Sequence, residues 1–347
     1  MRSASEADWV CVLDTGSTDD TVALLRAHGA IVEQKRIEPW RFDDARNESM
    51  KLIPPEADVC CCVDLDEQFR PGWRAALEAA WKPDTTRARY RYTWSFNPDG
   101  SEGVVFYPEK FHKNGCYRWK HPVHEILEYV GEGAERVVTA RGVQLDHHPD
   151  AAKSRAQYLP LLELAVAEAP EDDRCRHYLG REYLYRGEWQ KAIDTLRAHL
   201  ALPSATWADE RAASMRFIAR CYRHLGRDDL AAAWYHRAIA EAPHLREPYV
   251  DYASLLYDHG NWEGVAYFAR CALAVTERGA TYITEGYAWG ALPWDYLAIA
   301  EWNLGRADEA AEACRRAVAL APEEERLQNN LAIFERALYN KKQEQLL

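Results

Sequence analysis

The sequence lacks a long apolar run. No stretch approaches the roughly 18 consecutive apolar residues that a membrane-spanning helix needs. The first residues, Met1–Asp8, also lack the apolar core of a secretory signal peptide. The sequence therefore predicts a cytoplasmic protein without a membrane span.

The sequence is also short of positive charge and of paired cysteines. It has 43 Lys and Arg residues against 55 Asp and Glu residues, which gives a net charge of −12. Nucleic acids and anionic membranes select basic surfaces, so neither is expected as the main partner. The nine cysteines show no C-x-x-C spacing, and several stand at apolar positions. This pattern favours free, reduced thiols and gives no sign of a zinc site.

What the sequence does contain is enough chain for two domains. Its 347 residues are 48% hydrophobic and 28% charged, which is ordinary for a globular protein. After Pro149 the composition shifts to alanine, leucine, arginine and glutamate with helical periodicity. We therefore predict one domain over residues 1–150 and a second over residues 151–347.

An acidic tripeptide follows a short apolar run in the first domain. Residues 59–63 are typical of a buried strand, and Asp64 and Asp66 come directly after it. Ligands of α/β sheets lie beyond the carboxyl ends of strands. Carboxylates at i and i+2 of a strand project to the same side and can share a divalent cation. The alternative is a solvated acidic turn.

A strand, turn, helix and strand precede this stretch. The expected strands span residues 9–13 and 30–34, and the helix between them spans residues 21–28. Gly16 permits a tight turn after the first strand, and Gly29 ends the helix. This arrangement is of the mononucleotide-binding kind, although any strand–helix–strand unit with a good N-cap would read the same way.

Three segments stand in a distinctive order: V-L-D-T-G-S-T-D-D-T at 12–21, R-F-D-D-A-R-N-E-S at 41–49 and C-V-D-L-D-E at 62–67. The order resembles the inverting family-2 glycosyltransferases of the GT-A fold, especially bacterial and phage members that carry tetratricopeptide repeats. The resemblance is strong over about residues 9–75 and weaker to about residue 150. It implies an α/β, GT-A-like (Rossmann-like) domain followed by an all-α repeat solenoid.

The resemblance also implies roles for single residues. Asp14 would meet the nucleotide base or ribose, and Arg46 and Asn47 would lie near the donor. Asp66 would contact the metal, with Asp64 on the ribose or the metal. A guanidinium fork suits phosphate on chemical grounds too. The alternative for Arg46 is a surface arginine that pairs with a neighbouring aspartate at position 43 or 44.

The chain departs from this family at its start. Members usually begin with another strand and helix, whereas about eight residues precede Trp9 here. We expect a start codon placed too late. The alternative is a sheet that lacks a strand, which would put donor binding in doubt.

The remaining site residues follow a predicted hairpin of residues 89–96 and 104–107. The resemblance makes Glu125 the candidate general base, beside His124, with Trp119 as a platform for a sugar face. The alternatives are Trp119 as a core residue and Glu125 as a strand-end carboxylate paired with Lys120. After a last short strand at 143–145, the resemblance favours His147 over its neighbour as the residue that closes the metal shell. Imidazole would favour Mn²⁺ over Mg²⁺ as the divalent metal.

The second domain shows internal repeats. The glycines at 187, 226, 260 and 305 are 39, 34 and 45 residues apart, with small residues, a following proline and helical patterns around them. This resembles the tetratricopeptide repeat, in which glycine occupies the turn between paired helices. The longest insertion is near residues 281–293, and its Tyr and Trp residues are expected mostly in the repeat core.

The sequence therefore predicts a metal-dependent transferase with a nucleotide-sugar donor. Stacked repeats form a groove for peptides or proteins, so a macromolecular acceptor is expected there. A rigid brace or a homodimer surface is the alternative use of the repeats. Two other interpretations remain open: a non-catalytic repeat scaffold with a relic nucleotide-sugar-binding domain, and a nucleotide-binding regulator.

Overall fold

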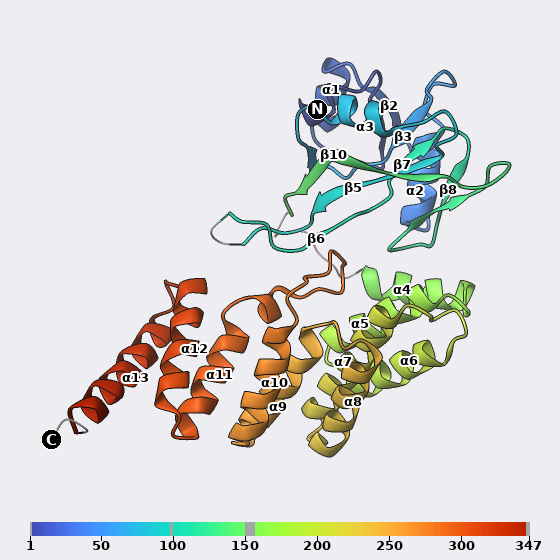
Figure 1. Cartoon of the computed structure of the whole chain (residues 1–347). Helices are drawn as coiled ribbons and strands as arrows, with labels where there is room; N and C mark the ends of the chain where they lie inside the picture. Colours follow the sequence, from blue (N-terminus) through green and yellow to red (C-terminus); the bar gives the residue numbers. More distant parts are fainter. Residues whose placement is uncertain (1, 98–99, 150–156, 345–347) are drawn as a thin grey trace. The chain divides into compact units, whose positions relative to one another are not determined.

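The computed structural model describes residues 2–97, 100–149 and 157–344 (Figure 1). The chain divides into two compact units, Met1–Pro170 and Glu171–Leu347. The predicted boundary at residue 150 lies outside the described residues, and the observed boundary follows Pro170 because helix α4 (Tyr158–Glu168) belongs to the first unit. Among the described helices, none has the length and apolar composition needed to cross a bilayer.

The predicted strand–helix–strand unit is present at the start of the chain. Strand β1 (Cys11–Asp14), helix α1 (Thr21–Ala27) and strand β2 (Ile31–Gln34) follow one another, after a short 3₁₀ helix η1 (Arg2–Ala4). The two strands are parallel but form a separate two-stranded sheet. The continuous Rossmann-like sheet expected from the sequence is therefore not observed.

The main sheet of the first unit is mixed. Its strand order is β3 (Val59–Cys61), β7 (Phe111–Lys113), β5 (Arg87–Thr93), β10 (Val137–His147) and β4 (Glu67–Phe69), with β6 (Val105–Phe106) paired to β5. Strand β10 is parallel to β5, and the other pairings are antiparallel. The β5–β6 pairing confirms the predicted hairpin. The last strand is much longer than the predicted residues 143–145.

Strand β3 stops two residues before its predicted end, so Asp64 and Asp66 lie in the turn between β3 and β4. The backbone explains this early stop. The N–H of Asp64 donates to the Glu67 carboxylate at 2.8 Å, and the N–H of Glu67 donates to the Asp64 carbonyl at 3.0 Å. These local bonds turn the chain before a strand ladder can continue. The expectation that strand geometry aligns the two carboxylates is therefore wrong.

Aromatic residues fill the core beside this sheet. Alternate residues of β5 point inward, among them the fully buried Tyr90. Phe69, Phe111 and Trp73 of helix α3 (Trp73–Ala80) pack around it, with ring centroids 4.7–6.2 Å apart. Helix α2 (Phe42–Met50) and the hairpin of β8 (Tyr117–Lys120) and β9 (Ile126–Tyr129) complete the unit.

Helix pairs build the second unit. The described helices are α5 (Asp173–Tyr185), α6 (Trp189–Ala201), α7 (Ala208–His224), α8 (Asp228–Glu241), α9 (Glu247–Asp258), α10 (Trp262–Ala274), α11 (Leu292–Asn303), α12 (Ala307–Leu320) and α13 (Glu325–Glu344). The four repeat glycines stand in the turns within the pairs with φ of 65–75°, a left-handed conformation that glycine adopts without strain. At Gly180 a Cβ would lie 2.5 Å from Leu196, so α5 and α6 pack closely there. The predicted helical repeats are confirmed.

The long insertion lies between α10 and α11 and contains the 3₁₀ helix η2 (Gly286–Trp289). Its aromatic side chains pack against the first helices of earlier pairs. Tyr282 stacks on Tyr178 of α5 at 5.6 Å, and the Tyr287 hydroxyl donates to Asp251 of α9 at 2.6 Å. These aromatic residues therefore belong to contacts made by the insertion, whereas the sequence predicted them mostly in the repeat core.

Candidate functional site

Arg46 on α2 is the centre of a charged cluster in the first unit. Its side chain is 13% exposed. Its Nη2 donates to Asp64 Oδ1 at 2.9 Å, its Nε donates to Glu125, and its Nη1 donates to the Cys62 sulfur at 2.9 Å. Burial lowers the pKa of this guanidinium, but Cys62, Asp64 and Glu125 outweigh the burial and raise the pKa well above its usual value. Arg46 is thus a fixed positive charge between two carboxylates.

The predicted alternative for Arg46 is wrong. Arg41, at the start of the same helix, takes the neighbouring aspartates instead. Its guanidinium lies 2.9 Å from Asp43 and 3.6 Å from Asp44. Arg46 instead pairs with Asp64 and Glu125, which lie outside α2.

Glu125 lies in the same cluster, directly before β9. Its side chain is 11% exposed and paired with Arg46. The predicted alternative partner, Lys120, instead lies 3.7 Å from Glu128 across the β8–β9 hairpin. Arg46 donates to one oxygen of this carboxylate, Oε1, so the second oxygen, Oε2, is the one that could act as a base.

The loop that carries Glu125 has unusual backbone geometry. His121 and His124 have φ of 80° and 51°, which non-glycine residues rarely adopt. The His124 ring stacks on Tyr158 of α4 at 5.9 Å. Residues in strained conformations persist where the surrounding structure holds them, and they gather at functional sites. The sequence placed His124 beside the candidate base but gave no sign of this strain.

Asp66 and His147 form a second pair in the first unit. His147 Nε2 lies 3.5 Å from Asp66 Oδ2, and its Nδ1 lies 3.0 Å from the Trp94 carbonyl. A carbonyl only accepts, so Nδ1 carries a proton, and Nε2 is the nitrogen that faces Asp66. Such an outer hydrogen bond is how proteins orient metal-binding histidines. His148, by contrast, stacks on Phe96. These two residues fit the predicted metal.

Two charged residues that the sequence did not single out complete the cluster. Glu67 is buried, accepts from the Tyr92 hydroxyl at 2.8 Å, and lies 2.6 Å from Lys110 Nζ. Lys110 Nζ also lies 3.9 Å from Asp64. Burial lowers the pKa of Lys110, but Glu67 and Asp64 reverse this and raise it. Glu67 stands next to the D-L-D motif, whereas Lys110 carries no motif of its own.

Asn47 and Trp119 contact each other, and their predicted ligand roles stay predictions. The Asn47 amide donates to the Trp119 carbonyl at 2.9 Å and accepts from the Trp119 N–H at 2.8 Å. Both ends of the amide therefore tie α2 to β8. Trp119 is 5% exposed and packs with Tyr117 and Leu127. The core alternative fits Trp119, because a buried ring offers no open face to a sugar.

Asp14 holds its own turn after β1. Its carboxylate accepts from the backbone N–H groups of Gly16 at 3.3 Å and Ser17 at 3.2 Å, and from the Gln34 amide at 3.3 Å. Hydrogen bonds, first those from Ser17, lower the pKa of Asp14. These contacts give Asp14 a structural role, and its predicted contact with the nucleotide stays a prediction.

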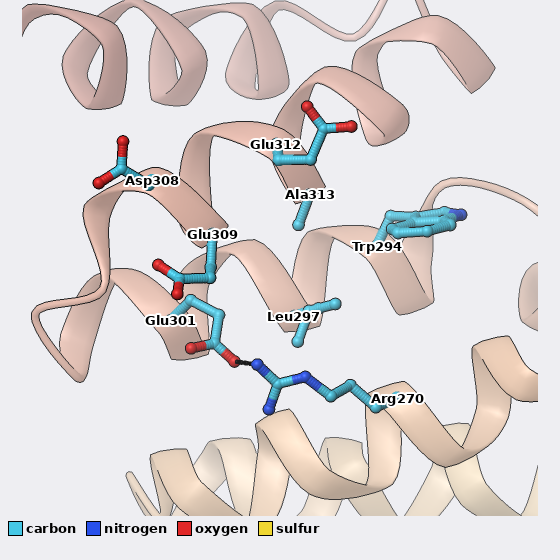
Figure 2. A pocket seen from close by; sticks show the side chains of 8 residues that line it. All are labelled: Arg270, Trp294, Leu297, Glu301, Asp308, Glu309, Glu312 and Ala313. Carbon is cyan, nitrogen blue, oxygen red and sulfur yellow. Dashed lines mark ion pairs between the residues drawn. The ribbon is translucent and has the colours of Figure 1, made fainter. Parts of the chain in front are cut away.

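The second unit contains a pocket of about 420 Å³ between α10, α11 and α12 (Figure 2). Four of its eight lining residues are acidic, and the lining consists of Arg270, Trp294, Leu297, Glu301, Asp308, Glu309, Glu312 and Ala313. Arg270 reaches across from α10 to Glu301 at 2.5 Å (Figure 2). No residue predicted as part of the transferase site lines this pocket.

Comparisons with known proteins match the repeats. Tetratricopeptide repeat profiles match residues 179–245 and 292–334. Among solved structures, the C-terminal part of a tetratricopeptide-repeat protein from Cytophaga hutchinsonii is 14% identical and covers 54% of this chain and 67% of its own, with a TM-score of 0.44. MamA from Desulfovibrio magneticus is 15% identical over 49% of this chain and 88% of its own, with a TM-score of 0.39. A search of curated proteins found no match. The second unit thus contains tetratricopeptide repeats.

Proposed function

We propose that the first unit is a metal-dependent glycosyltransferase domain that uses a nucleotide-sugar donor. The observation that carries the proposal is the contact of Arg46 with both Asp64 and Glu125. These residues come from α2, the β3–β4 turn and the segment before β9, and the glycosyltransferase resemblance assigned them to one site. The inverting stereochemistry rests on that resemblance alone.

The cluster has the charges that such a reaction needs. Asp66 and His147 would hold the metal, and a bound Mn²⁺ would neutralise the departing diphosphate. Arg46 would bind a donor phosphate through its guanidinium. A phosphate that attracts this guanidinium would loosen its hold on Glu125, which could then accept the proton of the acceptor hydroxyl. Asp14, Asn47 and Trp119 are not needed for these steps.

A screen for nucleotide-sugar hydrolysis with Mn²⁺ tests the proposal without knowledge of the acceptor. We expect hydrolysis of at least one donor, lost in EDTA and lost in Asp66→Asn. Asp84→Asn is the matched control, because Asp84 is 68% exposed and lies 3.6 Å from the surface residue Arg136. Equal hydrolysis by both variants, or full activity in EDTA, would remove the metal from the account.

A protein-binding scaffold is the second candidate function, and the repeat matches favour it because they lie entirely in the second unit. In this case the first unit is a relic, and a protein or peptide partner or a second copy of the chain binds to the repeats. Absence of hydrolysis with every donor, together with a dimer in light scattering, would favour this candidate over the transferase.

A further inference from the structure

Three ligand-forming side chains meet inside the second unit. His177 comes from α5, His199 from α6 and Glu210 from α7, and their exposed fractions are 0%, 0% and 4%. One nitrogen or oxygen atom from each lies within 4.8 Å of the chosen atoms of the other two. The cluster lies within the repeats and shares no residue with the charged cluster of the first unit.

The hydroxyl of Ser214 orients both imidazoles. Its Oγ lies 2.8 Å from His177 Nδ1 and 3.0 Å from His199 Nδ1. A hydroxyl oxygen has two lone pairs and can accept from both Nδ1–H groups. In that arrangement each Nε2 keeps a lone pair. Ser214 then has the position of the outer hydrogen-bond acceptor that metal-binding histidines commonly have.

The Nε2 atoms of both histidines are buried without a hydrogen-bond partner among the described residues. His199 Nε2 lies 3.3 Å from Glu210 Oε1 but makes no hydrogen bond of acceptable geometry. A buried polar atom without a hydrogen-bond partner destabilises the folded state. A bound cation would satisfy both nitrogens at once.

The charges of the cluster suit a cation. With a proton on each Nδ1 toward Ser214 and a lone pair on each Nε2, both imidazoles are neutral. Glu210 accepts from the Tyr282 hydroxyl through Oε2, and its other oxygen, Oε1, lies 3.3 Å from His199 Nε2. The cluster thus offers two neutral nitrogens and one carboxylate.

We propose that His177, His199 and Glu210 bind a Zn²⁺ ion. Two imidazoles and one carboxylate are a common zinc donor set, and nitrogen ligands disfavour Ca²⁺ and Mg²⁺. The three side chains close around the ion by small movements, and a water molecule takes the fourth position. The ion links three consecutive helices, the first pair and the start of the next.

The site also connects to the insertion before α11. The Tyr282 hydroxyl donates to Glu210 Oε2, and the Tyr282 ring lies between Tyr178 at 5.6 Å and Trp207 at 5.6 Å. A carboxylate that binds a metal through one oxygen and accepts a hydrogen bond through the other is fixed in orientation. Zinc binding therefore holds the insertion against α5 and α7.

The test uses the full chain with Asp66→Asn, so that the metal proposed for the first unit does not contribute. We expect one equivalent of Zn²⁺ to bind, and Co²⁺ to replace it with the visible absorption of a tetrahedral site. His177→Gln and His199→Gln should each weaken binding at least tenfold. His259→Gln should bind normally, because that histidine is exposed and pairs with Asp228 on the surface.

Crystals of the same Asp66→Asn chain grown with ZnCl₂ give a second test that needs no change in the repeats. An anomalous peak at the zinc edge between the three side chains would support the proposal. A crystal without that peak, or equal zinc affinity in all histidine variants, would overturn it. The cluster would then be a hydrogen-bonded network in which Ser214 donates to one imidazole.

Discussion

An arginine stands between two carboxylates in each unit, but the two surroundings differ. In the first unit Arg46 contacts Asp64, whose side chain is 43% exposed. In the second unit Arg216 is 1% exposed and contacts Glu285 of the insertion at 2.8 Å and Asp251 of α9 at 3.6 Å. The insertion covers the second arginine, whereas one partner of the first remains open to solvent.

The difference in solvent exposure distinguishes a candidate binding site, around Arg46, from a structural contact, around Arg216. A charge network closed by the protein's own segments has no place for a ligand, so its role is to hold the insertion on the helices. An arginine with an accessible carboxylate beside it can exchange that partner for a phosphate. Under the proposed function, the same residue type would serve binding in the first unit and packing in the second.

The largest expected effect breaks the closed network. Arg216→Met removes the buried guanidinium that pairs with Asp251 and Glu285 and leaves them only Arg220, so we expect a loss of roughly 3 kcal/mol in the free energy of unfolding. Arg46→Met should cost less, because water can solvate the open Asp64. Denaturant unfolding of the full chain, followed by probes in each unit, measures both. Equal losses would remove the distinction between the two arginines.

An intermediate effect is expected from pH in the first unit. Burial lowers the pKa of His112 to about 4, below the usual 6.5. The unfolded chain therefore binds this proton more readily, and the stabilising contribution present above pH 6.5 is lost as the pH falls to 4. The loss is roughly 3 kcal/mol at most, at 1.36 kcal/mol for each pKa unit. Unfolding of His112→Gln between pH 7 and 4 should show a flatter dependence, while the exposed His28→Gln should follow the unmodified chain.

The smallest effect concerns Asn47. Asn47→Ala removes two hydrogen bonds to the Trp119 backbone, and we expect a loss of about 1–2 kcal/mol in the free energy of unfolding. Donor affinity should stay unchanged in calorimetric titrations. A large loss of donor affinity without loss of stability would show that Asn47 contacts the donor.

The repeats were the most predictable part, because their signals are local. Gly187 and the other three repeat glycines indicate turns, because glycine adopts the left-handed conformation without strain. The helices between these turns are predicted by the helical periodicity of the apolar residues. The sequence could not predict which helices the insertion packs against, because the ion pair between Glu285 and Arg216 joins segments far apart in the chain. The cluster of His177, His199 and Glu210 was not predicted for the same reason, because its members come from three different helices. Cysteines, whose spacing usually indicates a zinc site, take no part in it.

In the first unit the sequence predicted part of the charged cluster but not its geometry. Arg46, Asp64 and Glu125 do meet, and His147 rather than His148 faces Asp66. The strand argument for the two aspartates failed because Glu67 turns the chain through local hydrogen bonds. Lys110 was missed because a lone lysine between short strands has no distinguishing pattern.

The central claim is that Asp66 and His147 hold a catalytic metal, and Mn²⁺ titration followed by electron paramagnetic resonance tests it most directly. The matched pair is His147→Gln and His148→Gln, measured with a panel of nucleoside diphosphates present. The account predicts that His147→Gln weakens Mn²⁺ binding at least tenfold, while His148→Gln, whose ring only stacks on Phe96, leaves it unchanged. Equal affinity in the two variants, or no Mn²⁺ binding by the unmodified chain, would contradict it.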